Sequence, residues 1–287
     1  MRLLALEPVS DREGLILQHL WRLRFLTGAQ LAEFVFGGST VTLGSRTVMT
    51  QRVLASLKTR AMVAALPAIV DHPGVGEARP AYYLTAKGLR AARSVWPGPA
   101  PRHLRSSGAF LVRHALATAE TILAFRRAAF ADPGHELVAW ECDWQAALSL
   151  GSSLVEPDAY LLYRVGVERL HVLIEMDMGS EHTRFIAGKM RRYLDVHRAG
   201  SWRSRMPVWP IILVIAQTAA RLVQLRRVCE AVSALPGGEW NTAASFHFAT
   251  LAAVTCQDGP LGTIWQVVGS PDHTGLFPDS ELPRDAE

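Results

Sequence analysis

The sequence has few cysteines and no apolar run long enough to cross a membrane. Its three cysteines, Cys142, Cys229 and Cys256, lie far apart and form no CxxC pair. This spacing predicts neither a zinc site nor a disulfide framework and favours a reducing compartment. The longest apolar stretch, VWPIILVIA at residues 208–216, is less than half the ~20 residues that span a bilayer. With no signal-peptide pattern at its start, the chain is expected to be soluble and cytoplasmic, with no membrane partner.

Two kinds of functional motif are also missing. The P-loop pattern GxxxxGK[ST] does not occur, which argues against an ATP-driven activity. The ten histidines show no HxH or HExxH spacing, which argues against metal binding by histidine. The chain has 287 residues, 49% hydrophobic and 20% charged, so it is long enough for two domains and has the composition of a globular protein.

Charge is distributed unevenly along the chain. Residues 1–104 hold 13 Lys and Arg against 6 Asp and Glu, a net charge of +7, whereas residues 105–287 hold 17 against 20, a net charge of −3. Basic regions are typical of nucleic-acid-binding domains. The N-terminal part is therefore the candidate for contact with nucleic acid.

Three helical patterns open the chain. Apolar residues recur at helical spacing within residues 11–26. Thr27 and Gln30 then form the pattern of a capping box for a second helix that ends near Gly37. Ser45 is the expected cap of a third helix, whose first turns carry polar side chains.

Two strand patterns follow, at residues 63–70 and 82–84, and they flank the turn-forming stretch DHPGVGEARP. The motif YYLTAKGL ends the second strand and begins another helix. Three helices and a hairpin make a winged helix. This order, over roughly residues 11–95, resembles the winged helix-turn-helix domains of bacterial regulators, and we assign residues 1–95 to such a domain.

The resemblance implies that the third helix enters the major groove of double-stranded DNA and that the hairpin contacts the backbone or the minor groove. The residues implied are Arg46, Thr47, Thr50, Gln51, Arg52 and Arg79. Gln51 or Arg52 would read base edges. Two alternatives stay open, because winged helices also dock proteins and an arginine-bearing helix face can simply be solvated. The basic charge of the region favours DNA.

The rest of the chain predicts a second domain. Residues 96–108, WPGPAPRHLRSSG, have the composition of a linker. Residues 109–269 give the order helix, three strands, helix, strand, helix, strand, which predicts a central mixed sheet flanked by helices. Residues 270–287 are rich in proline and acidic residues and are expected to form a mobile tail. The whole chain is therefore expected to be mixed α/β.

Carboxylates lie on two neighbouring strands of this domain. Glu175 and Asp177 alternate along one strand and should share a face of the sheet. Asp158, after Pro157 on the preceding strand, would approach them if the two strands form a hairpin across Gly166. Three like charges this close need a counter-ion, and hard cations such as Mg²⁺ or Mn²⁺ prefer oxygen ligands. We therefore predict a metal site of Asp158, Glu175 and Asp177.

The segments EPDAYLLYR and LHVLIEMDMGSE, which carry these carboxylates, resemble the PD-(D/E)xK nuclease superfamily. In that superfamily an Asp after Pro and an acidic residue on the next strand bind the metal, and a Lys two residues later helps to position the attacking water. Here Asp177 stands at that third position. Some members recruit a lysine from the following helix, and Lys189, the only lysine in residues 105–287, lies on the helix predicted there. The resemblance thus implies a catalytic role for Lys189.

Three further residues take part in the predicted site. Arg191 and Arg192 follow Lys189 on the same predicted helix, and guanidinium groups suit phosphate. Glu120, on the helix before the sheet, matches an accessory acidic residue of many superfamily members. The implied catalytic set is Asp158, Glu175, Asp177, Lys189 and Glu120.

A wider resemblance is to the replication-relaxation family of plasmid and mobile-element proteins, which joins a winged helix to a nuclease-like domain. The matching pieces are YYLTAKGLRAA, HALATAE, PDAYLL, IEMDMGSE, KMRRYL, LVIAQTAARLVQLRR and GPLGTIW. This resemblance implies a role in plasmid replication or DNA transfer. The expected partners are double-stranded DNA, replication or transfer proteins, and a second copy of the chain as a homodimer.

Two functions remain open from the sequence. The first is a DNA-binding protein whose nuclease-like domain is an accessory or regulatory module and needs no cofactor. The second is an endodeoxyribonuclease dependent on Mg²⁺ or Mn²⁺. Because the strand lacks the lysine of the nuclease pattern, we favour the first.

Overall fold

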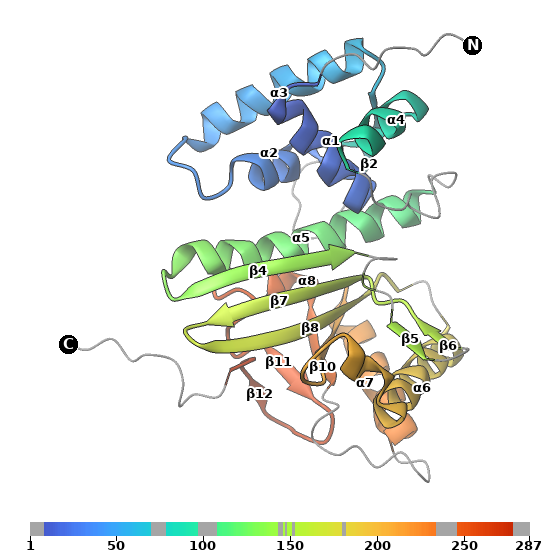
Figure 1. Cartoon of the computed structure of the whole chain (residues 1–287). Coiled ribbons are helices and arrows are strands. Elements are labelled where there is room, and N and C mark those ends of the chain that lie inside the picture. The colour runs from blue at the N-terminus through green and yellow to red at the C-terminus, as the bar shows by residue number, and fades with distance from the viewer. Residues whose placement is uncertain are drawn as a thin grey trace, which may run out of the picture. The chain divides into compact units, whose positions relative to one another are not determined.

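The computed structural model describes residues 9–69, 79–96, 108–142, 146, 148–150, 153–179, 182–233 and 246–277. These fall into two units, Met1–Leu123 and Ala124–Glu287 (Figure 1). Helices and a seven-stranded mixed sheet confirm the predicted mixed α/β class. No helix in the described part of the chain is long and apolar enough to cross a membrane. Residues 97–107 of the predicted linker and 278–287 of the predicted tail lie outside the described residues.

The N-terminal unit contains the three predicted helices and a small antiparallel sheet of order β1-β3-β2. Its elements are α1 (Asp11–Leu23), β1 (Leu26–Thr27), α2 (Gly28–Phe36), α3 (Leu43–Thr59), β2 (Val63–Ile69), β3 (Arg79–Leu84), α4 (Ala86–Val95) and the first part of α5 (Ala109–Ala131). The two-residue strand β1 was not predicted. Residues 71–78 of the predicted turn DHPGVGEARP lie outside the described residues, and its last two residues, Arg79 and Pro80, begin β3.

Hydroxyl side chains set the starts of the helices. The capping box of α2 is confirmed, because Thr27 N donates to Gln30 Oε1 at 3.1 Å and Gln30 N donates to Thr27 Oγ1 at 3.2 Å. The predicted cap of α3 was wrong. Thr42, with an extended backbone, is the cap and accepts from Ser45 N at 3.3 Å. Ser45 is already in the first turn, where its backbone N–H is one of the groups that need a cap.

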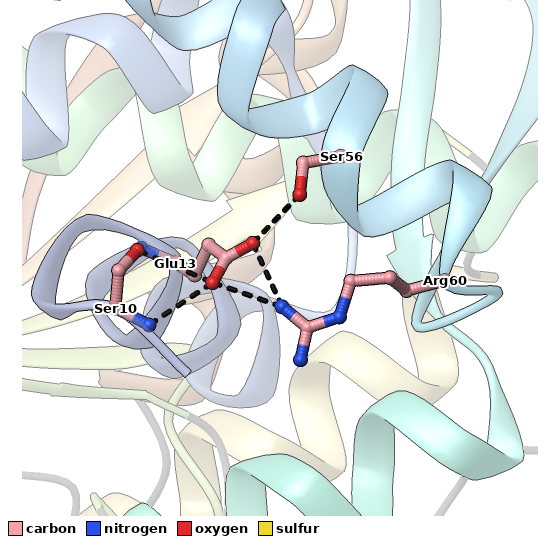
Figure 2. Close-up of polar contacts among 4 residues, drawn as sticks. All are labelled: Ser10, Glu13, Ser56 and Arg60. Carbon is pink, nitrogen blue, oxygen red and sulfur yellow. Dashed lines mark hydrogen bonds and ion pairs between the residues drawn. The ribbon is translucent and has the colours of Figure 1, made fainter. Parts of the chain in front are cut away.

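Glu13 joins α1 to α3 inside the N-terminal unit (Figure 2). Its carboxylate completes the capping box of α1 with Ser10 and accepts from Ser56 Oγ at 2.9 Å. Arg60 Nη1 donates to both carboxylate oxygens, at 2.9 and 3.0 Å. Ser56 lies in the last turn of α3 and Arg60 is its C-cap residue. One buried carboxylate therefore fixes the end of α3 against the start of α1.

The C-terminal unit is built on a sheet of order β12-β11-β10-β9-β8-β7-β4 (Figure 1). Pairing is parallel between β8 and β9 and between β9 and β10, and antiparallel elsewhere in this sheet. The strands are β4 (His135–Cys142), β7 (Ala159–Val165), β8 (Glu168–Asp177), β9 (Ile211–Ala216), β10 (Phe246–Thr250), β11 (Trp265–Val267) and β12 (His273–Thr274). A separate hairpin pairs β5 (Leu148–Leu150) with β6 (Ser153–Val155). The helices are α6 (Thr183–Ala199), the 3-10 helix η2 (Ser201–Ser204), α7 (Ala219–Ser233) and α8 (Leu251–Val254).

Sequence patterns predicted the longer strands of this sheet but missed the short ones. The β5–β6 hairpin, β11 and β12 were not expected. The strand predicted over residues 246–254 ends at Thr250, whose hydroxyl accepts from Ala253 N at 3.2 Å and starts α8. The residues of α8 are apolar like those of β10, so the hydrophobic pattern alone did not show where the strand ends and the helix begins.

Helices cover both faces of this sheet. Leu173 of β8 packs in one core cluster with Ile186 of α6 and Leu222 of α7, so these two helices cover the face that Leu173 shares with Glu175. Phe125 of α5 packs on Tyr163 of β7 on the other face, with ring centroids 5.7 Å apart. The carboxylate-bearing face therefore lies under α6 and α7.

The Glu13 contacts predict a pH-dependent stability of the N-terminal unit. Burial alone would raise the pKa of Glu13, but the bonds from Ser10, Ser56 and Arg60 and the charge of Arg60 outweigh it and lower the pKa below 4.5. Stability from this group is therefore complete above pH 4.5 and is lost as the pH falls through the lowered pKa. Glu13→Gln should cost about 1–3 kcal/mol at neutral pH, measured by amide hydrogen exchange in α1 and α3.

The comparison variant is Ser56→Ala, which removes one hydrogen bond from the same carboxylate and leaves its charge and the Arg60 pair in place. At neutral pH this variant should lose less unfolding free energy than Glu13→Gln does. The loss from Glu13→Gln should shrink as the pH falls below 4.5 and through the lowered pKa, because the wild-type carboxyl is protonated first in the unfolded chain and then in the folded one. A loss from Glu13→Gln that stays constant down to pH 3 would contradict the assignment.

Candidate functional site

The β7–β8 hairpin places Asp158 beside Glu175. The two strands pair antiparallel across a turn at Gly166, where φ is 55°, so the predicted hairpin is confirmed. Asp158 N donates to Ile174 O at 2.9 Å, and Asp158 Oδ2 accepts from Met176 N at 2.7 Å. The backbone on both sides of Glu175 thus holds Asp158 next to it, on the same face of the sheet.

Both oxygens of Glu175 are bonded by side chains of α6. Tyr193 Oη donates to Oε1, and the Lys189 ammonium forms an ion pair with Oε2. Lys189 and Tyr193 are four residues apart and therefore lie on one face of the helix. Glu175 and Tyr193 are buried, whereas the Lys189 side chain keeps 28% of its exposure. The site is therefore a buried carboxyl whose ion-pair partner, Lys189, is partly exposed to solvent.

Burial dominates the electrostatics of Glu175. It raises the pKa of this carboxyl to about 7; the Lys189 charge opposes the rise and the Asp158 charge adds to it. Burial also raises the pKa of Tyr193 well above 10, helped by the charges of Glu175 and Asp158, so Tyr193 stays protonated and donates. A carboxyl with this pKa can take up or release a proton near neutral pH, as groups at functional sites often do.

Asp177 lies on the same face of β8, but it is paired with arginine. Arg221 Nε donates to Oδ1 at 2.8 Å and Arg221 Nη2 donates to Oδ2 at 2.9 Å, while Gly179 N also donates to Oδ1 at 2.8 Å. Arg221 belongs to the first turn of α7, and its own N–H donates to Thr218. The pair ties the end of β8 to the start of α7 in a bidentate geometry that gives both strength and orientation.

The predicted three-carboxylate metal site is not assembled among the described residues. No group of three or more His, Cys, Asp or Glu side chains there is positioned to hold a metal ion, and Asp177 faces a guanidinium. Asp158 and Glu175 remain as a pair. Mg²⁺ in proteins often takes only one or two carboxylates and completes its shell with substrate phosphate and water. This pair would accept a metal that arrives with a phosphate only after the Lys189 ammonium leaves Glu175 Oε2, and Asp177 is not assigned to the pair.

Three other residues were predicted for this site. Glu120 is in the N-terminal unit, where its Oε2 accepts from Gln30 Nε2 at 3.1 Å. Arg191 and Arg192 are exposed on α6.

The predicted DNA-contacting residues of α3 divide into exposed and buried ones. Thr47, Gln51 and Arg52 are exposed. Thr50 is fully buried, and its hydroxyl donates to Arg46 O at 2.8 Å, so its predicted contact with DNA does not agree with the structure. Every third or fourth helix residue turns toward the core, and Thr50 falls on that side.

Arg46 has a local partner before α3. Its guanidinium donates to Val41 O at 2.6 Å and to Ser39 O at 2.7 Å. Arg46 therefore holds the segment that leads from α2 into α3, which limits its reach toward DNA. Arg79 is exposed at the start of β3.

Two residues of the C-terminal unit were missed from the sequence. Tyr193 had a usable signal, because KMRRYL places it four residues after Lys189 and so on the same helix face. Arg221 had none, because it lies 44 residues after Asp177. Only the parallel pairing of β8 with β9 brings the start of α7 to Asp177.

The family model described as Replication-relaxation matches residues 17–212, which is more than half of the chain. The matched range includes Asp158, Glu175 and Lys189 and ends before Arg221. No curated protein and no solved structure is significantly similar to the chain.

The Asp177–Arg221 pair predicts a measurable coupling. In a double-mutant cycle with Asp177→Ala and Arg221→Ala, we expect a coupling energy of about 1–3 kcal/mol, measured by urea unfolding. The control cycle uses Glu136 and Arg164, whose side chains are 51% and 42% exposed, and should give less than about 1 kcal/mol. Equal coupling in the two cycles, or none for Asp177 and Arg221, would show that the arginine does not hold Asp177.

Proposed function

The chain belongs to the replication-relaxation family, and we propose on this basis that it is a DNA-binding protein of plasmid or mobile-element replication or transfer. The N-terminal unit acts as a winged helix and binds duplex DNA through α3. The C-terminal unit, with a nuclease-like arrangement of strands and carboxylates, acts as an accessory or regulatory module.

The exposed face of α3 is the observation that carries the proposal. The helix holds Arg46, Arg52 and Lys58 and no Asp or Glu, within a region of net charge +7. Leu54 and Leu57 face the core, so the helix is anchored on one side and free of acidic groups on the other. Such a surface is attracted to the phosphates of DNA, and no carboxylate of this helix repels them.

The side chains on this face have the chemistry of base recognition. Gln51 follows Thr47 by four residues, so these two side chains lie on one side of the helix, and Arg52 is the next exposed residue. A Gln side chain pairs bidentately with adenine in the major groove, and Arg52 beside it contacts a phosphate. The hairpin of β2 and β3, with Arg79 exposed on β3, supplies the expected backbone contact.

Salt dependence tests this proposal. We expect duplex affinity to fall steeply with salt, and Arg52→Ala to reduce the slope of log K against log salt by about 1, because one phosphate contact is lost. Fluorescence anisotropy with labelled duplex measures the slope. The control is Arg93→Ala on α4, another exposed arginine of the same unit, which should leave the slope unchanged. If both variants behave as wild type, α3 is not the DNA-binding element.

A second candidate function is a metal-dependent endodeoxyribonuclease. It is favoured by the grouping of Asp158, Glu175 and Lys189 at one place. A bound Mg²⁺ or Mn²⁺ would offset charge on the phosphate and lower the pKa of a bound water. Glu175 and Asp158 would hold it together with the phosphate, Lys189 would donate to a phosphate or water oxygen, and Tyr193 would keep Glu175 in place.

Cleavage of supercoiled DNA in Mg²⁺ or Mn²⁺ separates the two functions. For a nuclease, wild type nicks or linearises the DNA, and Glu175→Gln and Asp158→Asn abolish this. Asp195→Asn, a change to an exposed carboxylate on the same helix α6, should retain activity. If wild type shifts the DNA in a gel but leaves it intact, the nuclease candidate fails and the DNA-binding function stands alone.

A further inference from the structure

Helix α6 has a buried face and an exposed, strongly basic one. Its buried residues pack into the core of the sheet; they are Ile186, Met190, Tyr193, Leu194 and Val196. Its cationic residues are Arg184, Lys189, Arg191, Arg192 and Arg198, against Asp195 as the one acidic residue. Residues 105–287 as a whole carry a net charge of −3, so this helix concentrates positive charge in an otherwise acidic region.

An exposed aromatic ring lies at the start of this basic face. The Phe185 side chain is 56% exposed. The Arg184 guanidinium lies over the ring, 4.9 Å from its centroid. The guanidinium covers one part of the ring, and the 56% exposure leaves area on which a second flat group can stack. Beside cationic groups that partner is best a base attached to a phosphate.

Open space follows the ring along the helix. A Cβ atom built on Gly188 would meet no atom within 4 Å, so a ligand can approach the helix backbone there. Phe185, Gly188, Lys189 and Arg192 are spaced by three, four and seven residues and therefore form one stripe along α6. The stripe spans about 10 Å at 1.5 Å per residue.

We propose that this stripe, Phe185, Gly188, Lys189 and Arg192, binds single-stranded DNA, with one unpaired base stacked on the Phe185 ring. Arg192 contacts phosphate, and the open side of Gly188 admits the sugar or base. Lys189 lies within the stripe and pairs with Glu175, so a bound strand passes directly over the Glu175 site.

Stacking explains why the strand is single. An aromatic side chain stacks only on a base whose face is open, and in a duplex the neighbouring base pairs cover those faces. The surface lies in the C-terminal unit and does not depend on α3. It therefore goes beyond the duplex binding proposed above and can fail or succeed independently of it.

The test uses the full chain, a labelled single-stranded oligonucleotide and fluorescence anisotropy. Phe185→Ala should weaken binding roughly 5- to 150-fold, the range expected for the loss of one stacked base. Phe185→Trp should restore it, because tryptophan stacks as well. The matched control is Phe130→Ala on α5, since Phe130 is 53% exposed and has Arg126 over its ring at 5.2 Å; it should leave binding unchanged.

An abasic strand of the same length separates stacking from charge. Phe185→Ala and wild type should bind this strand equally, because it keeps the phosphates and has no bases. The proposal is overturned if wild type does not bind the normal strand, if Phe185→Ala binds it as tightly as wild type, or if Phe185→Trp fails to restore binding. It is also overturned if Phe185→Ala weakens binding to the abasic strand by the same factor. Duplex affinity, measured with the same variants, tests the proposed binding of duplex DNA by α3 separately from the proposed binding of single strands by α6.

Discussion

A carboxylate that leaves water needs hydrogen-bond donors and an opposite charge, because its uncompensated burial costs several kcal/mol. Two glutamates of this chain meet that need through helices. In the N-terminal unit Glu13 takes Arg60 and Ser56 from the end of α3. In the C-terminal unit Glu175 takes Lys189 and Tyr193 from α6. Each glutamate therefore fixes the helix to which we assign contact with DNA.

The two carboxylates differ in how well their donors offset burial. Around Glu13 the hydrogen bonds and the Arg60 charge prevail, so its pKa falls and it stays ionised as a structural anchor. Around Glu175 burial prevails over the Lys189 charge, and its pKa rises to about 7. Burial with donors therefore leaves Glu13 ionised at neutral pH, whereas Glu175 changes its protonation near pH 7.

Local signals in the sequence predicted much of the fold. The Thr27–Gln30 capping box and the hairpin across Gly166 follow from residues close in the chain, and both are present. The hairpin was sufficient to bring Asp158 to Glu175.

Features that depend on distant parts of the chain were not predicted. Asp177 pairs with Arg221 because β9 lies parallel to β8 and delivers α7 to its end. The burial of Thr50 depends on which side of α3 meets the core. The cap of α3 was misplaced because Thr42 and Ser45 are both hydroxyl residues three apart, and only the backbone conformation distinguishes them. Sequence patterns therefore located the carboxylates, and tertiary packing decided which of them share a site.

Photo-crosslinking from α3 tests the central claim most directly. A benzophenone amino acid is placed at Gln51, on the exposed face of α3, and at Arg93 on α4 as the comparison position. If α3 lies in the groove of duplex DNA, irradiation should crosslink the Gln51 derivative to duplex in low salt, and much less in high salt. The Arg93 derivative should give little product in either. Equal crosslinking from the two positions, or none from Gln51 under conditions where the chain binds duplex, would contradict the account.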